Sequence, residues 1–84
     1  MDILQFVDML DGWYHNAHPH SRLKSLRLEC GMSQSQLAAQ SGVPLRTLQQ
    51  YEQRQKNINA ARADYLLNLA MALHCLPKML LEPA

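Results

Sequence analysis

The chain has 84 residues, of which 48% are hydrophobic and only 6% aromatic, and its formal net charge is +1. This length fits one domain with a small aliphatic core, and three glycines and four prolines are too few for the many turns of an all-β fold. No apolar run reaches the roughly 18 residues of a membrane span, and no basic residue introduces an apolar run near the N-terminus as in a signal peptide. We therefore expect an all-α protein of the cytoplasm, without a membrane segment.

Residues 1–20 carry three Asp and no Lys or Arg, and they are expected to form a separate N-terminal unit. Within them, residues 2–14 (DILQFVDMLDGWY) have the spacing of an amphipathic helix whose apolar arc is wider than one packing surface needs. Two interpretations stay open, packing against the rest of the chain or contact with another chain. The connector that follows holds His15, His18 and His20 with no cysteine nearby, so we interpret it as a polar linker and expect no metal.

Residues 21–84 show a series of helical patterns with marked boundaries. Ser21 is expected to cap a helix over RLKSLRLEC, in which Leu23 and Cys30 belong to the buried stripe. Cys30 and Cys75 match no zinc or redox spacing. A disulfide between them is possible on arithmetic alone, but for a reducing compartment we expect two free, buried thiols.

The next boundary predicts two short helices joined by a tight turn. Ser33 with Gln36 three residues later makes a capping box at the start of QSQLAAQS. Gly42 stands where a left-handed residue would turn the chain, and Pro44 fixes φ near a helix start. The second of these helices is expected over about residues 45–53.

After the polar loop RQKNIN, the pattern predicts one long helix and one short one. Asn59 is expected to cap a helix that runs through about His74, with Leu69 and Leu73 among its inward residues. A last short helical turn is expected to begin at Pro77.

The helix over residues 45–53 carries a continuous strip of polar and apolar side chains where a Glu/Lys mixture is usual. The strip consists of Leu45, Arg46, Gln49, Gln50 and Gln53. Two helices joined by a short turn with glycine describe a helix-turn-helix, whose second helix lies in the DNA major groove. There Gln pairs with adenine, Arg with guanine, and Leu covers a thymine methyl. A solubilising face is the plainer interpretation of this helix alone, but residues 21–56 also carry a charge of +4.

The segment LKSLRLECGMSQSQLAAQSGVPLRTLQQYE, followed by LLNLAMALHC, resembles the Cro/phage-repressor-like (XRE-type) helix-turn-helix family from about Ser21 to Leu81. The resemblance implies a five-helix, lambda-repressor-like DNA-binding domain over residues 21–84, to which the helix at 2–14 is an addition. It also implies sequence-specific binding to double-stranded DNA, usually as a homodimer on a palindromic operator.

The resemblance further implies which residues meet DNA bases. Leu45, Arg46 and Gln50 match the base-reading positions, and Gln49 faces the edge of the groove. Gln34 matches a glutamine that contacts a phosphate or supports the recognition helix.

Phosphate contacts and one structural pair are implied by the same resemblance. Arg54, Lys56 and Asn57 fall in a loop that meets phosphates, whereas Arg27 and Glu52 match a salt bridge between helices.

Three positions depart from the family pattern. Pro44 stands where Ser or Thr is usual, so a side-chain cap is missing. Arg54 and His74 each stand where glycine is common. If Arg54 adopts a positive φ, its backbone is strained.

The sequence contains no nucleophile–base arrangement, no Gly-rich phosphate loop and no paired carboxylates on one face, so we expect neither an enzyme nor a cofactor. The predicted function is a transcriptional regulator, expected to be a repressor. The alternative is a protein-interaction module, for example an antitoxin-like protein that binds its partner through the helix at 2–14.

Overall fold

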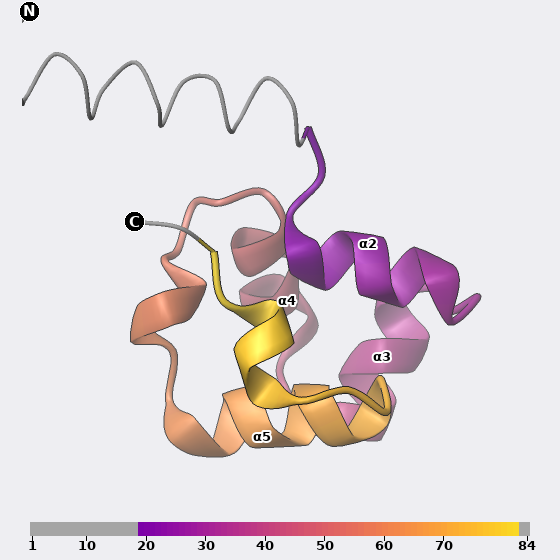
Figure 1. The fold of residues 1–84 in the computed structure, drawn as a ribbon. Coiled ribbons are helices and arrows are strands. Elements are labelled where there is room, and N and C mark those ends of the chain that lie inside the picture. The colour runs from indigo at the N-terminus through magenta and orange to yellow at the C-terminus, as the bar shows by residue number, and fades with distance from the viewer. Residues whose placement is uncertain (1–18, 83–84) are drawn as a thin grey trace, which may run out of the picture.

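The structure, a computed structural model, describes residues 19–82. Within this range lie four α-helices and two 3-10 helices, and no β-strand (Figure 1). In chain order they are α2 (Arg22–Glu29), α3 (Gln34–Ser41), α4 (Leu45–Glu52), η1 (Ile58–Ala60), α5 (Ala63–Ala72) and η2 (Pro77–Leu80).

The expected all-α class is confirmed over the described residues, but the count of five helices is not. The element expected to begin at Pro77 is the short 3-10 helix η2. The helix expected over 2–14 and most of the His-rich connector lie outside the described residues. No helix between residues 19 and 82 is long and apolar enough to cross a membrane.

Figure 1 shows α2 along one side of the domain and α5 along the opposite side, with η2 between them. Contacts join α3 to α4 and α5, α2 to α4, and η2 to both α2 and α5. The end of the described chain returns to the start of α2, where a Glu82 carboxylate oxygen accepts a hydrogen bond from the Arg22 backbone N–H at 3.1 Å. The Arg22 guanidinium also donates to the Leu81 carbonyl at 3.2 Å. These two hydrogen bonds join the end of the described chain to the start of α2, while α4 packs against both α2 and α3.

Serine side chains fix the starts of α2 and α3. The Ser21 hydroxyl oxygen accepts a hydrogen bond from the Lys24 backbone N–H at 3.1 Å. Ser33 and Gln36 make both bonds of a capping box, with donor–acceptor distances of 2.8 and 3.1 Å. A serine cap contributes about 1 kcal/mol to the stability of its helix. Both predicted caps are confirmed.

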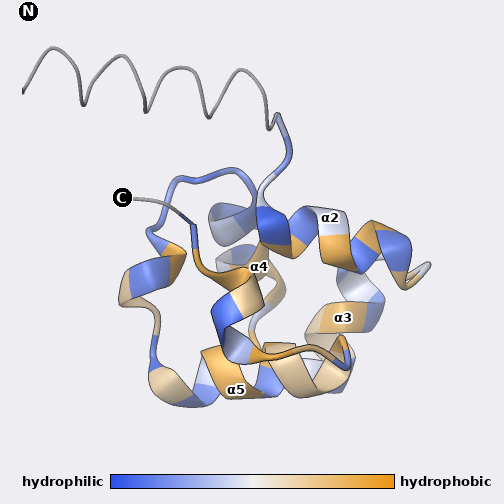
Figure 2. Ribbon diagram, in the orientation of Figure 1, coloured by the Kyte–Doolittle hydropathy of each residue, from blue (hydrophilic) through white to orange (hydrophobic). Residues whose placement is uncertain are grey.

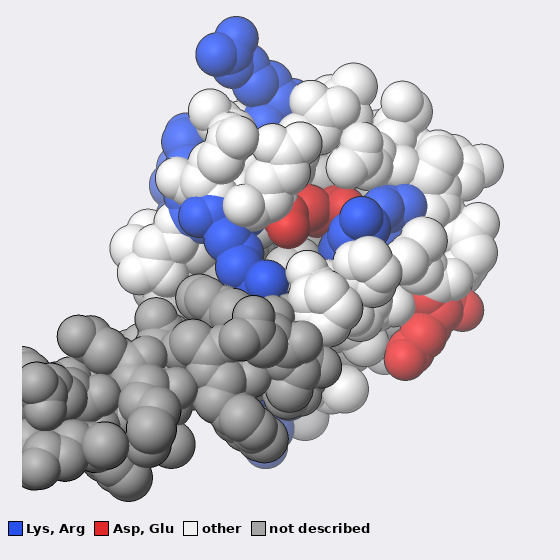
Figure 3. Space-filling view, turned by 90° about the horizontal axis from the view of Figure 1, so that it is seen from above, with Lys and Arg blue, Asp and Glu red and all other residues white. Residues whose placement is uncertain are grey.

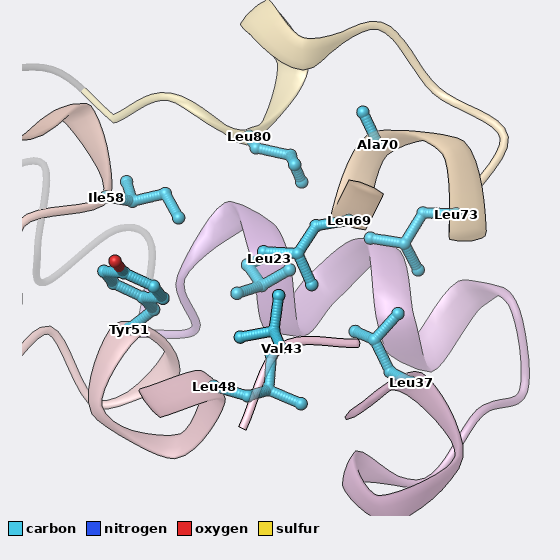
Figure 4. Packing of buried hydrophobic residues seen from close by; sticks show 10 residues of the cluster. All are labelled: Leu23, Leu37, Val43, Leu48, Tyr51, Ile58, Leu69, Ala70, Leu73 and Leu80. Carbon is cyan, nitrogen blue, oxygen red and sulfur yellow. The ribbon is translucent and has the colours of Figure 1, made fainter. Parts of the chain in front are cut away.

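Apart from Tyr51, the core between the helices is aliphatic (Figure 4). Its ten buried hydrophobic residues are Leu23, Leu37, Val43, Leu48, Tyr51, Ile58, Leu69, Ala70, Leu73 and Leu80. Burial of each large side chain contributes about 1.5–3 kcal/mol. Hydrophobic and hydrophilic residues alternate along α5 (Figure 2), and its apolar side chains include both buried Leu69 and Ala70 and exposed Leu67 and Met71.

The prediction that Cys30 is buried is wrong. Because α2 ends at Glu29, Cys30 is the C-cap residue and lies exposed, with its thiol 3.6 Å from the Leu73 carbonyl oxygen, to which it donates. Cys75 is half-buried, and both thiols are free. Burial, and secondarily the neighbouring Cys30, raise the pKa of the Cys75 thiol.

The helix expected to start after Asn59 begins later, at Ala63. The carboxamide oxygen of Asn57 accepts a hydrogen bond from the Asn59 backbone N–H at 3.0 Å, so Asn57 caps η1 instead. The Asn59 side chain pairs with the backbone of Glu82, whose N–H lies 2.9 Å from the Asn59 carboxamide oxygen. The cap was misplaced because Asn59 is used by a contact 23 residues away.

Candidate nucleic-acid interface

One side of α4 is buried in the core, and the other side is exposed or half-buried. Leu48 and Tyr51 are buried, with 0% and 7% of their surface exposed, as their helical spacing predicted. Leu45 is 39% exposed and Arg46 is also exposed, whereas Gln49 and Gln50 are half-buried.

The turn before α4 brings its first residues to the surface. Gly42 has a φ of 73°, in the left-handed region, and its N–H donates to the Ala38 carbonyl at 2.9 Å. A Cβ at Gly42 would meet no atom within 4 Å, so the backbone conformation and not crowding favours glycine here. Buried Val43 then anchors the turn, and exposed Pro44 precedes α4 without a side-chain cap. Two consecutive helices and a sharp glycine turn thus form a helix-turn-helix.

A buried ion pair joins α2 to the end of α4. The Arg27 guanidinium donates to both carboxylate oxygens of Glu52, at 2.8 and 3.0 Å, and to the Met32 carbonyl at 2.8 Å. The two side chains are only 8% and 1% exposed. Arginine and carboxylate match in a bidentate pair, which fixes orientation as well as distance. The structure therefore places the predicted pair in contact and locks the C-terminal end of α4 against α2.

Two glutamines continue from this ion pair to the strip on α4. The Gln34 side-chain amide donates to Glu52 Oε1 at 3.2 Å. The Gln49 side-chain amide in turn donates to the Gln34 carboxamide oxygen at 3.3 Å. Gln34 thus touches α4 directly, and its support of a base-reading helix, one of the two roles that the resemblance implied, stays a prediction. Its contact with a phosphate stays a prediction.

The loop after α4 holds the three other residues predicted to contact phosphates. Lys56 and Asn57 are exposed. Arg54 instead has partners within the chain: its guanidinium donates to both carboxylate oxygens of Glu82, at 2.9 and 3.2 Å, and to the His20 carbonyl at 3.2 Å. Its φ of 58° places this non-glycine residue in the left-handed region. The contacts of all three with DNA stay predictions.

A hollow of about 480 Å³ lies between α4, η1 and the start of α5. Sequence reasoning did not single out most of its lining, which consists of Thr47, Tyr51, Lys56, Asn57, Ala60, Arg62 and Tyr65. The Arg62 guanidinium lies 4.5 Å from the centre of the Tyr65 ring and 2.9 Å from an Asp64 carboxylate oxygen. The hydrogen bond to Asp64, together with its charge, raises the pKa of Arg62. The spacing of Arg62 and Tyr65, three residues apart at the start of a helix, is the signal that was available.

Positive charge is spread over the surface and does not form a block. Figure 3 shows one face, on which basic side chains occur at several separate places and acidic side chains lie close to some of them. Arg27, Arg54 and Arg62 are in ion pairs. In the described part of the chain no ion pair engages Arg46 or Lys56.

One comparison with known proteins agrees with this geometry. A family model described as helix-turn-helix matches residues 23–75, more than half of the chain, and this match runs from the second residue of α2 past the end of α5 and includes the turn between α3 and α4. No match was found among curated proteins or among solved structures. The matching family consists of DNA-binding regulatory domains. The chain therefore belongs to the XRE/Cro-type helix-turn-helix family, and it is a DNA-binding helix-turn-helix regulator.

Proposed function

We propose that the protein is a sequence-specific repressor that reads double-stranded DNA with α4 in the major groove. The observation that carries this proposal is the first turn of α4, where Leu45 is 39% exposed beside exposed Arg46. An exposed leucine beside an arginine without an ion pair contributes little to folding. Both side chains suit the major groove, where leucine covers a thymine methyl and arginine binds the O6 and N7 atoms of guanine.

The other residues of the interface follow from their places around α4. Gln49 and Gln50 lie one turn further along and suit adenine, whose N6 and N7 pair with a carboxamide. Lys56 and Asn57 are exposed in the loop after α4, within reach of a phosphate beside the groove. Gln34, next to Gln49, and Arg54 are secondary candidates, because both already hold partners within the chain.

We further propose that two copies bind a palindromic operator, in the cytoplasm. A helix this short reads only a few base pairs, so a second copy on the two-fold-related half-site supplies the remaining specificity. The centres of the half-sites should then be about 34–36 Å apart, one turn of DNA. The antitoxin-like alternative depends on residues 2–14, which lie outside the described residues, and no contact in residues 19–82 favours it.

The test is selection of binding sites from a random double-stranded DNA pool, at two salt concentrations. An enriched palindrome with half-sites about one turn apart supports the proposal. Affinity for the selected site should fall with salt, by about 0.9 in log K per tenfold increase in salt concentration for each neutralised phosphate.

Arg46→Ala should weaken binding to the selected site by about 1–3 kcal/mol and relax the preference for one base pair. Gln40→Ala, an exposed position on α3, is the matched control. Absence of any enriched site would contradict the proposal.

A further inference from the structure

A chain of hydrogen bonds runs from the buried Arg27–Glu52 ion pair to the surface of α4 through Gln34 and ends at Gln49. We infer that this chain fixes the direction of the Gln49 carboxamide, so that Glu52 and Gln34 are positioning residues that decide which hydrogen-bonding group Gln49 offers to a base. The inference rests on the proposed function, since it concerns how the same surface reads DNA.

The first step is the carboxylate of Glu52, which can only accept hydrogen bonds. Its Oε1 accepts from Arg27 Nη2 at 3.0 Å and from Gln34 Nε2 at 3.2 Å. The side chain is 1% exposed, and two bonds from Arg27 prevent it from turning. Glu52 is therefore a fixed acceptor.

The second step is the orientation of Gln34. A carboxamide has one donor end and one acceptor end, and the two look alike in shape. Because the neighbour is a carboxylate, Gln34 must turn its NH₂ group to Glu52. Its oxygen then faces Gln49, where it accepts from Nε2 at 3.3 Å. A flipped Gln34 would set its oxygen against the carboxylate, without a proton between them.

The third step is the orientation of Gln49. Because it meets an oxygen of Gln34, it must turn its own NH₂ group inward, and one of the two N–H bonds is used. Its carboxamide oxygen and its second N–H remain for a ligand. This pair of groups fits adenine, in which N6 donates and N7 accepts.

Gln50, the next residue, offers an internal comparison. It is half-buried like Gln49, but in the described part of the chain its side chain makes no hydrogen bond. Its carboxamide can turn over at little cost, so it can present either end to a base. The structure therefore predicts a sharper base preference opposite Gln49 than opposite Gln50.

One experiment is carried out on the free protein and does not depend on DNA. In ¹⁵N-labelled protein, the side-chain NH₂ protons of Gln49 should differ from those of Gln50 in chemical shift and show contacts to Gln34. Gln34→Met, which keeps the size but removes both hydrogen bonds, should make the Gln49 signals resemble those of Gln50. Gln40→Met on the same helix should leave them unchanged. Identical Gln49 signals in all three proteins would overturn the inference, whatever the protein does with DNA.

A second experiment measures base preference at the position that responds to Gln49→Ala. In the native protein adenine should be preferred there over guanine by about tenfold. Gln34→Met should bring this ratio close to one. Gln34→Lys can donate to Glu52 but cannot accept from Gln49, so the Gln49 oxygen should turn inward and its two N–H bonds outward. The preference should then shift toward guanine, whose edge only accepts in this groove.

The two experiments separate the possible failures. If both Gln34 variants weaken binding equally on all sequences and the Gln49 signals do not move, Gln34 is only a phosphate contact and the inference fails while the proposed function stands. If the native protein enriches no site, the proposed function fails, and the NMR signals alone decide whether the hydrogen-bonded chain orients Gln49. Melting temperatures of all variants should be compared first, to exclude loss of fold.

Discussion

The two halves of the domain end and begin their helices by different means. In the first half, from α2 to α4, Ser21 and Ser33 cap α2 and α3, although α4 begins without a side-chain cap, and the positive φ angles after α2 and α3 fall on Gly31 and Gly42. In the second half, after α4, Asn57 caps the short η1 but α5 and η2 begin without a side-chain cap, and the positive φ angles fall on Arg54 and His74. Local sequence preferences therefore shape the helix-turn-helix itself, while the part after α4 depends on contacts between distant residues.

Arg54 and His74 are the two residues with a positive φ in the second half, and Arg54 shows what a contact between distant residues does. Their φ angles, 58° and 54°, are unfavourable for residues with a side chain. Arg54 offsets its strain, because its guanidinium forms a two-bond pair with Glu82 and ties the end of α4 to the end of the described chain. His74 is exposed, and nothing in the structure explains why it stands where glycine would be unstrained. Replacement of residues in each half tests this difference.

The largest effect is expected in the first half, from Glu52→Ala. It leaves the Arg27 guanidinium buried without its partner, which should lower the free energy of unfolding by about 3–5 kcal/mol. Urea denaturation measures this. Asp64→Ala, in a pair whose side chains are 67% and 55% exposed, is the control and should have little effect on stability, because water screens the pair. Similar losses in the two variants would show that the buried Arg27–Glu52 pair contributes no more to stability than an exposed pair does.

The second effect is that of Gly42→Ala, which should destabilise the protein by about 1 kcal/mol. The left-handed conformation costs alanine about 1–2 kcal/mol, and the smaller freedom of alanine in the unfolded chain offsets about 0.5–1 kcal/mol of this. The added methyl group meets no atom within 4 Å, so the loss would come from the backbone conformation alone. The midpoint of urea denaturation should fall without a change in its slope. Gly42→Asn should lose less, because asparagine tolerates the left-handed region better. Equal losses for Ala and Asn would point to a cause other than backbone conformation.

Ser33→Ala should cost about 1 kcal/mol, since it removes the side-chain half of the capping box at the start of α3. Urea denaturation measures this loss of stability. Ser35→Ala, at an exposed position of the same helix, is the matched control and should have little effect. If the two substitutions lower stability equally, the Ser33 cap does not stabilise α3 in the way the geometry indicates.

The same contrast explains how much of the fold could be predicted from the sequence. The capping box at Ser33, the turn at Gly42 and the buried side of α4 depend on residues at most four apart, and all were predicted. The start of α5 was predicted wrongly because the Asn59 side chain binds the backbone of Glu82, which is distant in sequence, and α5 begins after Arg62 without a side-chain cap. Exposure of Cys30 was missed because α2 ends one residue early.

In the candidate site, too, some features follow from the sequence and others depend on contacts between helices. The strip on α4 follows from helical spacing, and the contact of Arg27 with Glu52 was implied by the family resemblance. The bonds that connect Gln34 to both Glu52 and Gln49 depend on how α3 lies against α4, and spacing within either helix does not give that orientation. The hollow beside Arg62 and Tyr65 was missed for the same reason, since it lies between elements.

The smallest effect, and the most direct test of the contrast, is expected from glycine at the two strained positions. His74→Gly removes a left-handed side chain that costs about 1–2 kcal/mol, and glycine's greater freedom in the unfolded chain returns about 0.5–1 kcal/mol of this. The protein should therefore be stabilised by between about 0 and about 1.5 kcal/mol, with the middle of this range below about 1 kcal/mol. Arg54→Gly relieves the same kind of strain but also removes the pair with Glu82, so it should give no gain.

Thermal and urea unfolding of both variants, with Arg54→Ala as a third, measure this difference. Arg54→Ala keeps the strained backbone and loses the ion pair, so it should be the least stable of the three. If Arg54→Gly stabilises the protein as much as His74→Gly does, the Arg54–Glu82 pair contributes nothing to folding. Arginine would then have to be explained by another role, of which contact with a DNA phosphate is the one predicted from the sequence. Binding of Arg54→Gly to the selected site, compared with His74→Gly, would then decide between the two roles.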